Sequence, residues 1–183
     1  HKQVFDGDRG PNTGGMGAYS PSPLVDEALT LQIARTIFAP VVKALATAGR
    51  PFRGLLYGGL MLTARGPMVI EWNCRFGDPE TQAVLQRLEG DLLPWLLGAA
   101  EGKLPGGALG IRSGTSVCVV LAAHGYPGTV RSGDVITNLP PGGRSEDGAL
   151  VLHAGTKRDG DRIVTAGGRV LGITADGRDL AAA

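Results

Sequence analysis

The chain has 183 residues, a length that suits one large domain or two small ones. Its apolar content of 43% is near the globular norm and excludes wholesale disorder, and the lack of a Gly-X-Y period excludes collagen. The net charge of +1 gives no indication of a nucleic-acid partner. Glycine accounts for 30 of the 183 residues, more than twice the usual share of roughly 7%, which predicts many loops or close backbone contacts with a ligand.

Neither a membrane segment nor a secretory signal is expected. The longest apolar run, 117–123, is much shorter than the roughly 20 residues that span a bilayer. The two cysteines, Cys74 and Cys118, lie in strand-like apolar runs and are predicted to be reduced core residues, which favours the cytoplasm. The first residue is His1, and the helical pattern at 180–183 is unfinished, so we expect a fragment of a longer protein.

The first half of the chain begins with a predicted loop over residues 6–23, long enough to suggest a functional role. A core helix is expected over about 24–48, with Asp26 as its N-cap, Gly49 after its end and a kink at Pro40. Strands are predicted at 53–63 and 67–74, joined by a tight turn. Helices follow from Pro79, capped by Asp78, and over about 91–101.

The second half of the chain has a different pattern of glycines and predicted strands. A Gly- and Pro-rich stretch at 102–114 is a candidate linker. Beyond it, glycine turns separate five predicted strands: 115–124, 129–137, 149–154, 161–165 and 168–174. We therefore predict an α+β chain with two domains, 1–107 and 108–183, of which the second is an antiparallel β-rich module.

Two oxygen-bearing side chains mark the end of the second strand. Glu71 and Asn73 are two residues apart, so they share one face of the strand. A carboxylate and an amide carbonyl suit Mg²⁺ or Mn²⁺, which complete their shells with water and substrate phosphates. Arg75 shares this face, beside the expected phosphates. The alternative is an exposed strand face on which a glutamate pairs with an arginine.

The glycine-rich segment 12–17 offers backbone N–H groups with little side-chain bulk, as anion-binding loops do. It is neither a P-loop nor a dinucleotide-binding fingerprint, so a purely structural loop is an equal alternative. His124 and His153 stand alone in the sequence and are predicted to be structural.

Together these segments resemble a known family. Residues 6–21 (DGDRGPNTGGMGAYSP) and 69–82 (VIEWNCRFGDPETQ) are similar to signatures of the phosphoribosylamine–glycine ligases, members of the ATP-grasp superfamily. Four shorter blocks follow in the family's order: 125–128, 133–136, 153–157 and 167–171. The similarity therefore extends over the whole chain.

The resemblance implies that residues 1–107 are the second lobe of an ATP-grasp domain, an antiparallel sheet with helices, and that 108–183 are an incomplete C-terminal β-rich domain. An N-terminal substrate domain and the first lobe would be missing. The implied reaction is ATP-dependent ligation of glycine to 5-phosphoribosylamine through glycyl phosphate, a cytoplasmic step of purine synthesis. ATP and Mg²⁺ or Mn²⁺ are the implied cofactors, and no nucleic acid or membrane is an implied partner.

The resemblance also implies roles for single residues. Glu71 and Asn73 match metal ligands, and Arg75 matches an arginine that steadies the transferred phosphoryl group. Asp78 would hold the amine substrate or tune Arg75. The implied substrate-binding residues are Asp8, Asn12, Thr13, Gly14, Gly15 and Gly17, and the implied adenine contacts are Met61 and Ile70. Many ATP-grasp relatives have an additional acidic ligand where this chain and its family have Gly59, so two protein metal ligands are expected.

Two alternatives stay open. One is another ATP-grasp carboxylate–amine ligase, such as a biotin-carboxylase-like enzyme, although the segment 10–17 (GPNTGGMG) argues against it. The other is that the isolated chain is a non-catalytic nucleotide- or metal-binding module. We expect the isolated chain to be inactive as a ligase, because half of the ATP clamp would be absent.

Overall fold

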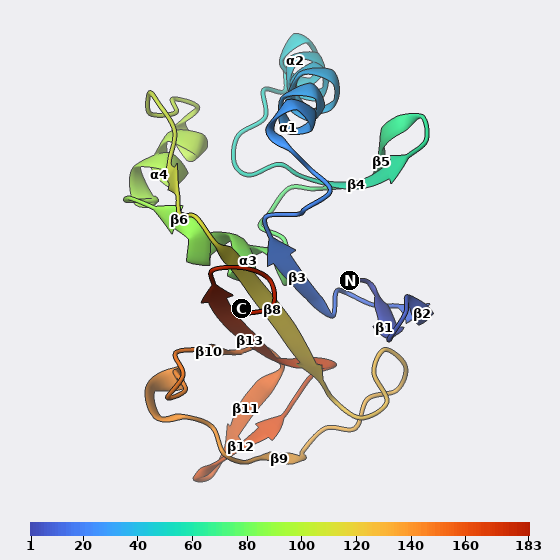
Figure 1. Ribbon diagram of the computed structural model, residues 1–183, viewed down its shortest axis with the longest axis vertical. Helices are drawn as coiled ribbons and strands as arrows, with labels where there is room; N and C mark the ends of the chain where they lie inside the picture. The colour runs from blue at the N-terminus through green and yellow to red at the C-terminus, as the bar shows by residue number, and fades with distance from the viewer. The chain divides into compact units, whose positions relative to one another are not determined.

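The chain contains helices and antiparallel strands, and all its α-helices precede residue 102, which confirms the predicted α+β class (Figure 1). The computed structural model describes residues 1–183. The helices are α1 (Glu27–Ile33), the π-helix η1 (Ala34–Phe38), α2 (Ala39–Thr47), α3 (Glu80–Arg87), α4 (Leu93–Glu101) and the 3₁₀ turn η2 (Pro141–Gly143). The strands are β1 (Gln3–Phe5), β2 (Arg9–Asn12), β3 (Gly17–Ser20), β4 (Tyr57–Thr63), β5 (Gly66–Asn73), β6 (Leu88–Glu89), β7 (Gly110–Ile111), β8 (Thr115–Ala122), β9 (Val135–Ile136), β10 (Leu150–His153), β11 (Thr156–Asp159), β12 (Arg162–Thr165) and β13 (Arg169–Gly177).

The chain forms two compact units. Unit 1 combines residues 1–20, 78–88 and 112–183, and unit 2 combines 21–77 and 89–111. These units are discontinuous, so they differ from the contiguous division at 107/108. The physical reason lies in unit 1, where the N-terminal strand β3 pairs with β8 and α3 packs on the same sheet.

A four-stranded antiparallel sheet in the order β10-β13-β8-β3 is the centre of unit 1. Helix α3 contacts β3, β8 and β13. Successive strand residues face opposite sides of a sheet, so the buried residues Ser116, Cys118 and Val120 share one face of β8. Ala83 of α3 is likewise buried, and the small side chains of α3 and β8 allow close packing.

The remainder of unit 1 is built from short strands. β9, β12 and β11 form a second antiparallel sheet, in the order β11-β12-β9, and β1 pairs with β2. Val170 and Leu171 of β13 and Ala123 form an apolar cluster with neighbouring residues of the β-rich module. The predicted strand 129–137 is reduced to β9, and β11 was not predicted.

The predicted 18-residue loop at 6–23 was wrong in part, because the segment contains β2 and β3. β3 reads Gly-Ala-Tyr-Ser, which has no clear alternation of apolar and polar residues. Its strand conformation comes from pairing with β8, from Gly17 opposite Val119 to Ser20 opposite Ser116. This long-range pairing is invisible in the local sequence.

Helices α1, η1 and α2 run on from one another over Glu27–Thr47 in unit 2. Asp26 caps the start, as predicted, because its Oδ1 accepts a hydrogen bond of 2.7 Å from the backbone N–H of Leu29. The π-helical turn η1 ends at Phe38, two residues before Pro40, which cannot donate a backbone hydrogen bond. The predicted interruption at Pro40 is thus a π-bulge within a continuous helix.

This helix was expected to lie in the core, but none of its residues is buried, so that expectation was wrong. The half-buried positions recur every fourth residue: Leu29, Ile33, Ile37, Val41 and Leu45. By length and composition alone, the 21-residue helix could cross a bilayer, which was not expected. One such helix is weak evidence for a membrane span, and a one-sided apolar stripe is typical of packing against protein.

An antiparallel hairpin of β4 and β5 is the second feature of unit 2. Thr63 pairs with Gly66, so the turn contains two residues, in agreement with the predicted tight turn. Phe38 meets Trp72 edge to face with ring centroids 5.0 Å apart, which fixes this helix against one face of the hairpin. Helix α4 follows and ends at Gly102, whose positive φ of 78° is typical of a helix C-terminus.

Candidate functional site

Glu71 and Asn73 both belong to β5 and occupy alternate positions, so they project from the same face, as predicted. Across the hairpin, Glu71 pairs with Gly59 and Asn73 with Tyr57. A β-carbon at Gly59 would lie 2.9 Å from Cγ and 3.4 Å from Oε1 of Glu71. The missing side chain at Gly59 therefore provides the space in which the Glu71 carboxylate lies.

This arrangement fits a hard divalent cation. A carboxylate and an amide on one strand face are oxygen donors, which such cations prefer. In the described chain, no cluster of three or more histidine, cysteine, aspartate or glutamate side chains is arranged for a metal. Glu71 and Asn73 would supply two ligands, and water and phosphate oxygens would supply the rest.

Arg75 lies two residues after the end of β5 and is exposed. Its Nη1 donates a hydrogen bond of 2.9 Å to the backbone carbonyl of Phe76, which holds one end of the guanidinium close to the loop. The neighbouring Cys74 is also exposed. The prediction that Cys74 is a core residue was therefore wrong: the apolar strand ends before it.

The predicted adenine contacts Met61 and Ile70 lie on adjacent strands of the hairpin. Their side chains are 55% and 58% exposed, unusually high values for apolar residues in paired strands. Ile70 falls at a β-bulge, because Gly59 pairs with Glu71 while the next residue, Leu60, pairs with Val69. The hairpin therefore presents an exposed apolar surface next to the Glu71 and Asn73 strand segment.

The glycine-rich loop belongs to unit 1 and is extensively hydrogen-bonded. Its backbone N–H groups donate to protein acceptors: Thr13 to the Lys2 carbonyl (2.7 Å), Gly14 to the Tyr126 hydroxyl (2.9 Å), Gly15 to Thr13 Oγ1 (3.0 Å) and Met16 to the His1 carbonyl (2.7 Å). These four N–H groups are not available to an anion in this structure. The loop is thus a defined structural element, which corresponds to the alternative left open from its sequence.

The remaining predicted substrate residues surround this loop. Asn12 ends β2 and pairs with Gln3, and Asp8 lies in the turn between β1 and β2 with a positive φ of 52°. Both are exposed. Gly15 and Gly17 are buried, so they contribute to packing of the loop rather than to its surface.

Asp78 has different partners from those expected. It was predicted to cap α3, but the N-cap is Pro79 and no side chain caps that helix. Instead, Asp78 Oδ1 accepts a hydrogen bond of 3.0 Å from Gln82 Nε2, and Oδ2 lies 3.3 Å from Nη2 of Arg169. The Asp78–Pro79 peptide is cis.

Arg169 was not singled out as a site residue, yet it contacts two predicted segments. Its Nη1 donates to the carbonyls of Asp78 (2.7 Å), Gly14 (3.0 Å) and Gly15 (3.5 Å). The only signal in the sequence was its place in the block 167–171. Strand β13 is far from the loop in sequence and reaches it through pairing with β8.

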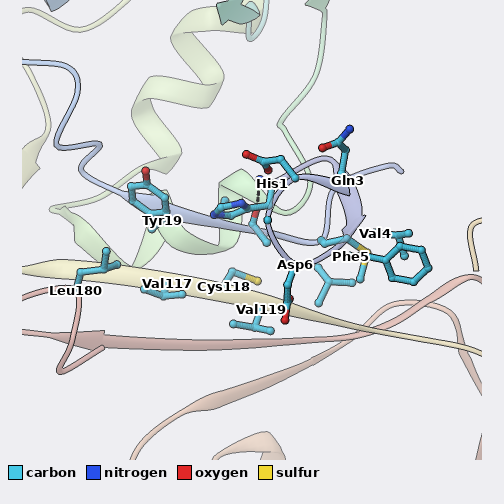
Figure 2. A pocket seen from close by; sticks show the side chains of 16 residues that line it. His1, Gln3, Val4, Phe5, Asp6, Tyr19, Val117, Cys118, Val119 and Leu180 are labelled. Carbon is cyan, nitrogen blue, oxygen red and sulfur yellow. Dashed lines mark hydrogen bonds between the residues drawn. The ribbon is translucent and has the colours of Figure 1, made fainter. Parts of the chain in front are cut away.

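A pocket of about 610 Å³ in unit 1 includes Asp8 and Gly17 in its wall (Figure 2). Figure 2 shows Tyr19, Val117 and Val119 along the side formed by β3 and β8. This largely apolar wall does not suit a phosphate group. Cys118 also lines the pocket, and burial raises the pKa of its thiol, so it is protonated at neutral pH and unsuited to nucleophilic chemistry.

The predicted residues thus fall into two sets. Unit 2 brings together the metal, phosphoryl and adenine candidates: Glu71, Asn73, Arg75, Met61 and Ile70. Unit 1 brings together the substrate loop and its neighbour: Asp8, Asn12, Thr13, Gly14, Gly15, Gly17 and Asp78. Arg169 and Tyr126 of unit 1 join the second set.

Two protein-family models match parts of this chain. The model of the ATP-grasp (A) domain of phosphoribosylglycinamide synthetase matches residues 1–81. The model of the C domain of the same synthetase matches residues 116–183. Both matches fall in the order expected from the sequence blocks.

Individual proteins give the same result. A Streptomyces coelicolor protein named phosphoribosylamine–glycine ligase is 51% identical over 98% of this chain and 44% of its own length. A crystal structure of the ligase of that name from Thermotoga maritima is 35% identical, with a TM-score of 0.83 over 98% of this chain and 43% of its own. Biotin carboxylase from Campylobacter jejuni is 19% identical, with a TM-score of 0.61 over 90% of this chain and 35% of its own, and shares the fold alone. The chain spans less than half the length of these proteins.

Proposed function

Because the chain belongs to the phosphoribosylglycinamide synthetase family, we propose that it is part of a phosphoribosylamine–glycine ligase. The proposed reaction joins glycine to 5-phospho-D-ribosylamine and converts ATP to ADP and phosphate. The observation that carries the proposal is sequence identity of about half over nearly the whole chain, including the segments that form both candidate sites.

The reaction divides into two steps. A carboxylate oxygen of glycine attacks the γ-phosphoryl group of ATP, which gives glycyl phosphate and ADP. The amine of phosphoribosylamine then attacks the acyl carbon, phosphate leaves, and the amine gives up a proton. Catalysis of both steps depends mainly on positioning and on stabilisation of charge, and water must be excluded from the acyl phosphate.

Unit 2 is proposed to act on the phosphoryl group. Glu71 and Asn73 would hold Mg²⁺ or Mn²⁺ with their side-chain oxygens, and a metal there would neutralise charge on the phosphates. Arg75, exposed beside them, would bind phosphoryl oxygens through the guanidinium donors that do not contact Phe76. Met61 and Ile70 would form part of the wall of the adenine site, which their exposure supports.

Unit 1 is proposed to hold the two smaller substrates. Asp8 and Asn12 would provide exposed polar side chains, and the loop 13–17 would provide a rigid boundary. Asp78 would hold the substrate amine through the carboxylate, in an orientation set by Gln82 and Arg169. The backbone N–H groups of residues 13–16 are not assigned to an anion, because each donates to a protein acceptor.

A larger protein is proposed to complete the site. The relatives are more than twice as long as their matched segments, which supports a first ATP-grasp lobe and a substrate domain elsewhere in the full-length protein. We retain 1–107 and 108–183 as the proposed limits of the second lobe and of the C-terminal domain. A cytoplasmic location follows from the proposed role in purine synthesis.

The test is ADP formation by the full-length protein that carries this sequence. We expect ADP only when glycine, phosphoribosylamine and a divalent metal are all present. Glu71→Gln should lower turnover by about 10³-fold, because it removes the charge of a proposed metal ligand near the transferred phosphoryl group. Glu101→Gln is the matched control, because Glu101 is an exposed residue at the end of α4.

Full activity of Glu71→Gln would contradict the metal assignment without affecting the ligase proposal. ADP formation with a different carboxylate or amine, and none with glycine and phosphoribosylamine, would instead favour another ATP-grasp ligase. A substrate panel of carboxylates and amines therefore separates the two outcomes.

A further inference from the structure

Arg169 links two segments that are far from it in sequence. Its Nη1 lies within hydrogen-bonding distance of three backbone carbonyls, at 2.7 Å from Asp78, 3.0 Å from Gly14 and 3.5 Å from Gly15. Its Nη2 forms an ion pair of 3.3 Å with the carboxylate of Asp78. One guanidinium therefore contacts both the glycine loop and the residue before Pro79.

The loop backbone is shaped around these contacts. A β-carbon on Gly14 would lie 3.2 Å from Cζ and Nε of Arg169. A β-carbon on Gly15 would lie 2.6 Å from Cδ of Pro79 and 3.5 Å from Nη1 of Arg169. Side chains at these two positions would push the loop away from Arg169 and Pro79, so the glycines permit this close approach.

The Arg169 contacts are partly shielded from solvent. The Arg169 side chain is 24% exposed, and that of Asp78 is 52% exposed. Arginine donates several hydrogen bonds from one rigid plane, a geometry that the single nitrogen of lysine cannot reproduce. The geometry thus depends on the guanidinium and not on positive charge alone.

We propose that Arg169 is a positioning residue, which holds the loop 12–17 and the carboxylate of Asp78 in the arrangement required for substrate binding. The kinetic consequences of this proposal rest on the ligase function proposed above. The contacts of Arg169 with the loop are independent of that function. Arg169 needs no contact with substrate for this role, because it acts through Asp78 and the loop.

The experiment compares Arg169→Ala, Arg169→Lys and Arg162→Ala in the full-length protein. Arg162 is the matched control, because it forms an exposed ion pair of 3.2 Å with Asp159 in a hairpin of the same unit. For Arg169→Ala, we expect kcat/KM for glycine and phosphoribosylamine to fall about 10²-fold, the loss typical of a small misplacement of reacting groups. The KM for ATP should stay near the wild-type value.

Two further readouts distinguish positioning from general stability. Free guanidinium should restore part of the activity of Arg169→Ala, and Arg169→Lys should lie between wild type and Arg169→Ala. Hydrogen exchange of the loop 12–17 should accelerate in both Arg169 variants but not in Arg162→Ala, while the rest of the sheet keeps its protection.

If the wild-type protein shows no ligase activity, the proposed function is contradicted. The hydrogen-exchange measurement still tests the positioning role of Arg169 in that case. Unchanged exchange in the loop, together with unchanged kinetics where activity is present, would overturn the positioning role. Accelerated exchange throughout the sheet would also overturn it, in favour of a general structural role. Arg169→Lys keeps the test available if Arg169→Ala does not fold.

Discussion

A β-carbon on Gly59 would come within 2.9 Å of Cγ of Glu71, its partner across the β4–β5 hairpin. This distance is shorter than side chains tolerate, so the conformation of Glu71 depends on glycine at position 59. The same position is where many ATP-grasp relatives are expected to carry an acidic metal ligand. In this chain the position supplies space rather than a ligand.

Gly59→Ala should therefore displace the Glu71 side chain. We expect metal-dependent turnover of the full-length protein to fall by about 10–100-fold, the usual cost of disturbing the orientation of a metal ligand. Turnover as a function of Mg²⁺ or Mn²⁺ concentration measures the effect. Gly106→Ala is the control, because a β-carbon there meets no atom within 4 Å. Equal metal dependence of both variants would contradict the link between Gly59 and Glu71.

Gly15→Ala should destabilise unit 1. Gly15 has a φ of +119°, and its β-carbon would lie 2.6 Å from Cδ of Pro79. Backbone strain alone costs about 1–3 kcal/mol, and the contact with Pro79 should add to it. Gly148, in the same unit, has a φ of +95° and no atom within 4 Å of an added β-carbon, so Gly148→Ala is the control for backbone strain without a contact. If denaturant unfolding gives an equal loss of unfolding free energy for both variants, the contact with Pro79 is unimportant.

The sequence predicted those parts of the fold that have a local signal. Asp26 capped its helix as expected, and the two-residue turn before Gly66 followed from the strand patterns around it. The strand β3 was missed because it is defined by pairing with β8 and has no pattern of its own. The N-cap of α3 was placed one residue early, because the Asp78 side chain binds Arg169 and Gln82.

For the candidate site, the shared face of Glu71 and Asn73 followed directly from strand periodicity. The hydrogen bonding of the glycine loop could not be predicted in this way. A run of glycines does not reveal whether its N–H groups face a ligand or protein acceptors. Arg169 was overlooked for a related reason: its partners are mostly backbone carbonyls, which leave no trace in side-chain chemistry. Such contacts appear only when the strand order is known.

The two cysteines should react differently with thiol reagents. Cys74 is exposed, while Cys118 is 0% exposed and burial raises the pKa of its thiol. A raised pKa reduces the thiolate fraction at a given pH, so both effects protect Cys118. In the purified 183-residue chain at neutral pH, we expect one reactive thiol before unfolding and two after it. Cys74→Ser should abolish the fast reaction, and two fast thiols in the folded protein would contradict the burial of Cys118.

Tyr126→Phe should weaken the glycine loop without removing an aromatic ring. The Tyr126 hydroxyl accepts the hydrogen bond of the Gly14 N–H at 2.9 Å. Loss of one such hydrogen bond should lower the free energy of unfolding by about 0.5–1.5 kcal/mol. Tyr19→Phe is the control, because Tyr19 contacts the ring of His1 through its own ring, at a centroid distance of 6.2 Å. Chemical denaturation measures the free energy of unfolding of both variants. Equal stability of Tyr126→Phe and wild type would show that water replaces the hydroxyl.

The purified 183-residue chain should show no ADP formation with ATP, glycine and phosphoribosylamine. The proposed site requires a second ATP-grasp lobe, and the matched relatives are more than twice as long as the segment shared with this chain. The measurement is coupled detection of ADP, with circular dichroism to verify that helices and strands have formed. The full-length protein, assayed at the same molar concentration, is the positive control. Turnover by the folded chain alone would contradict the requirement for a second lobe and would mean that these residues suffice to bind ATP and transfer its phosphoryl group.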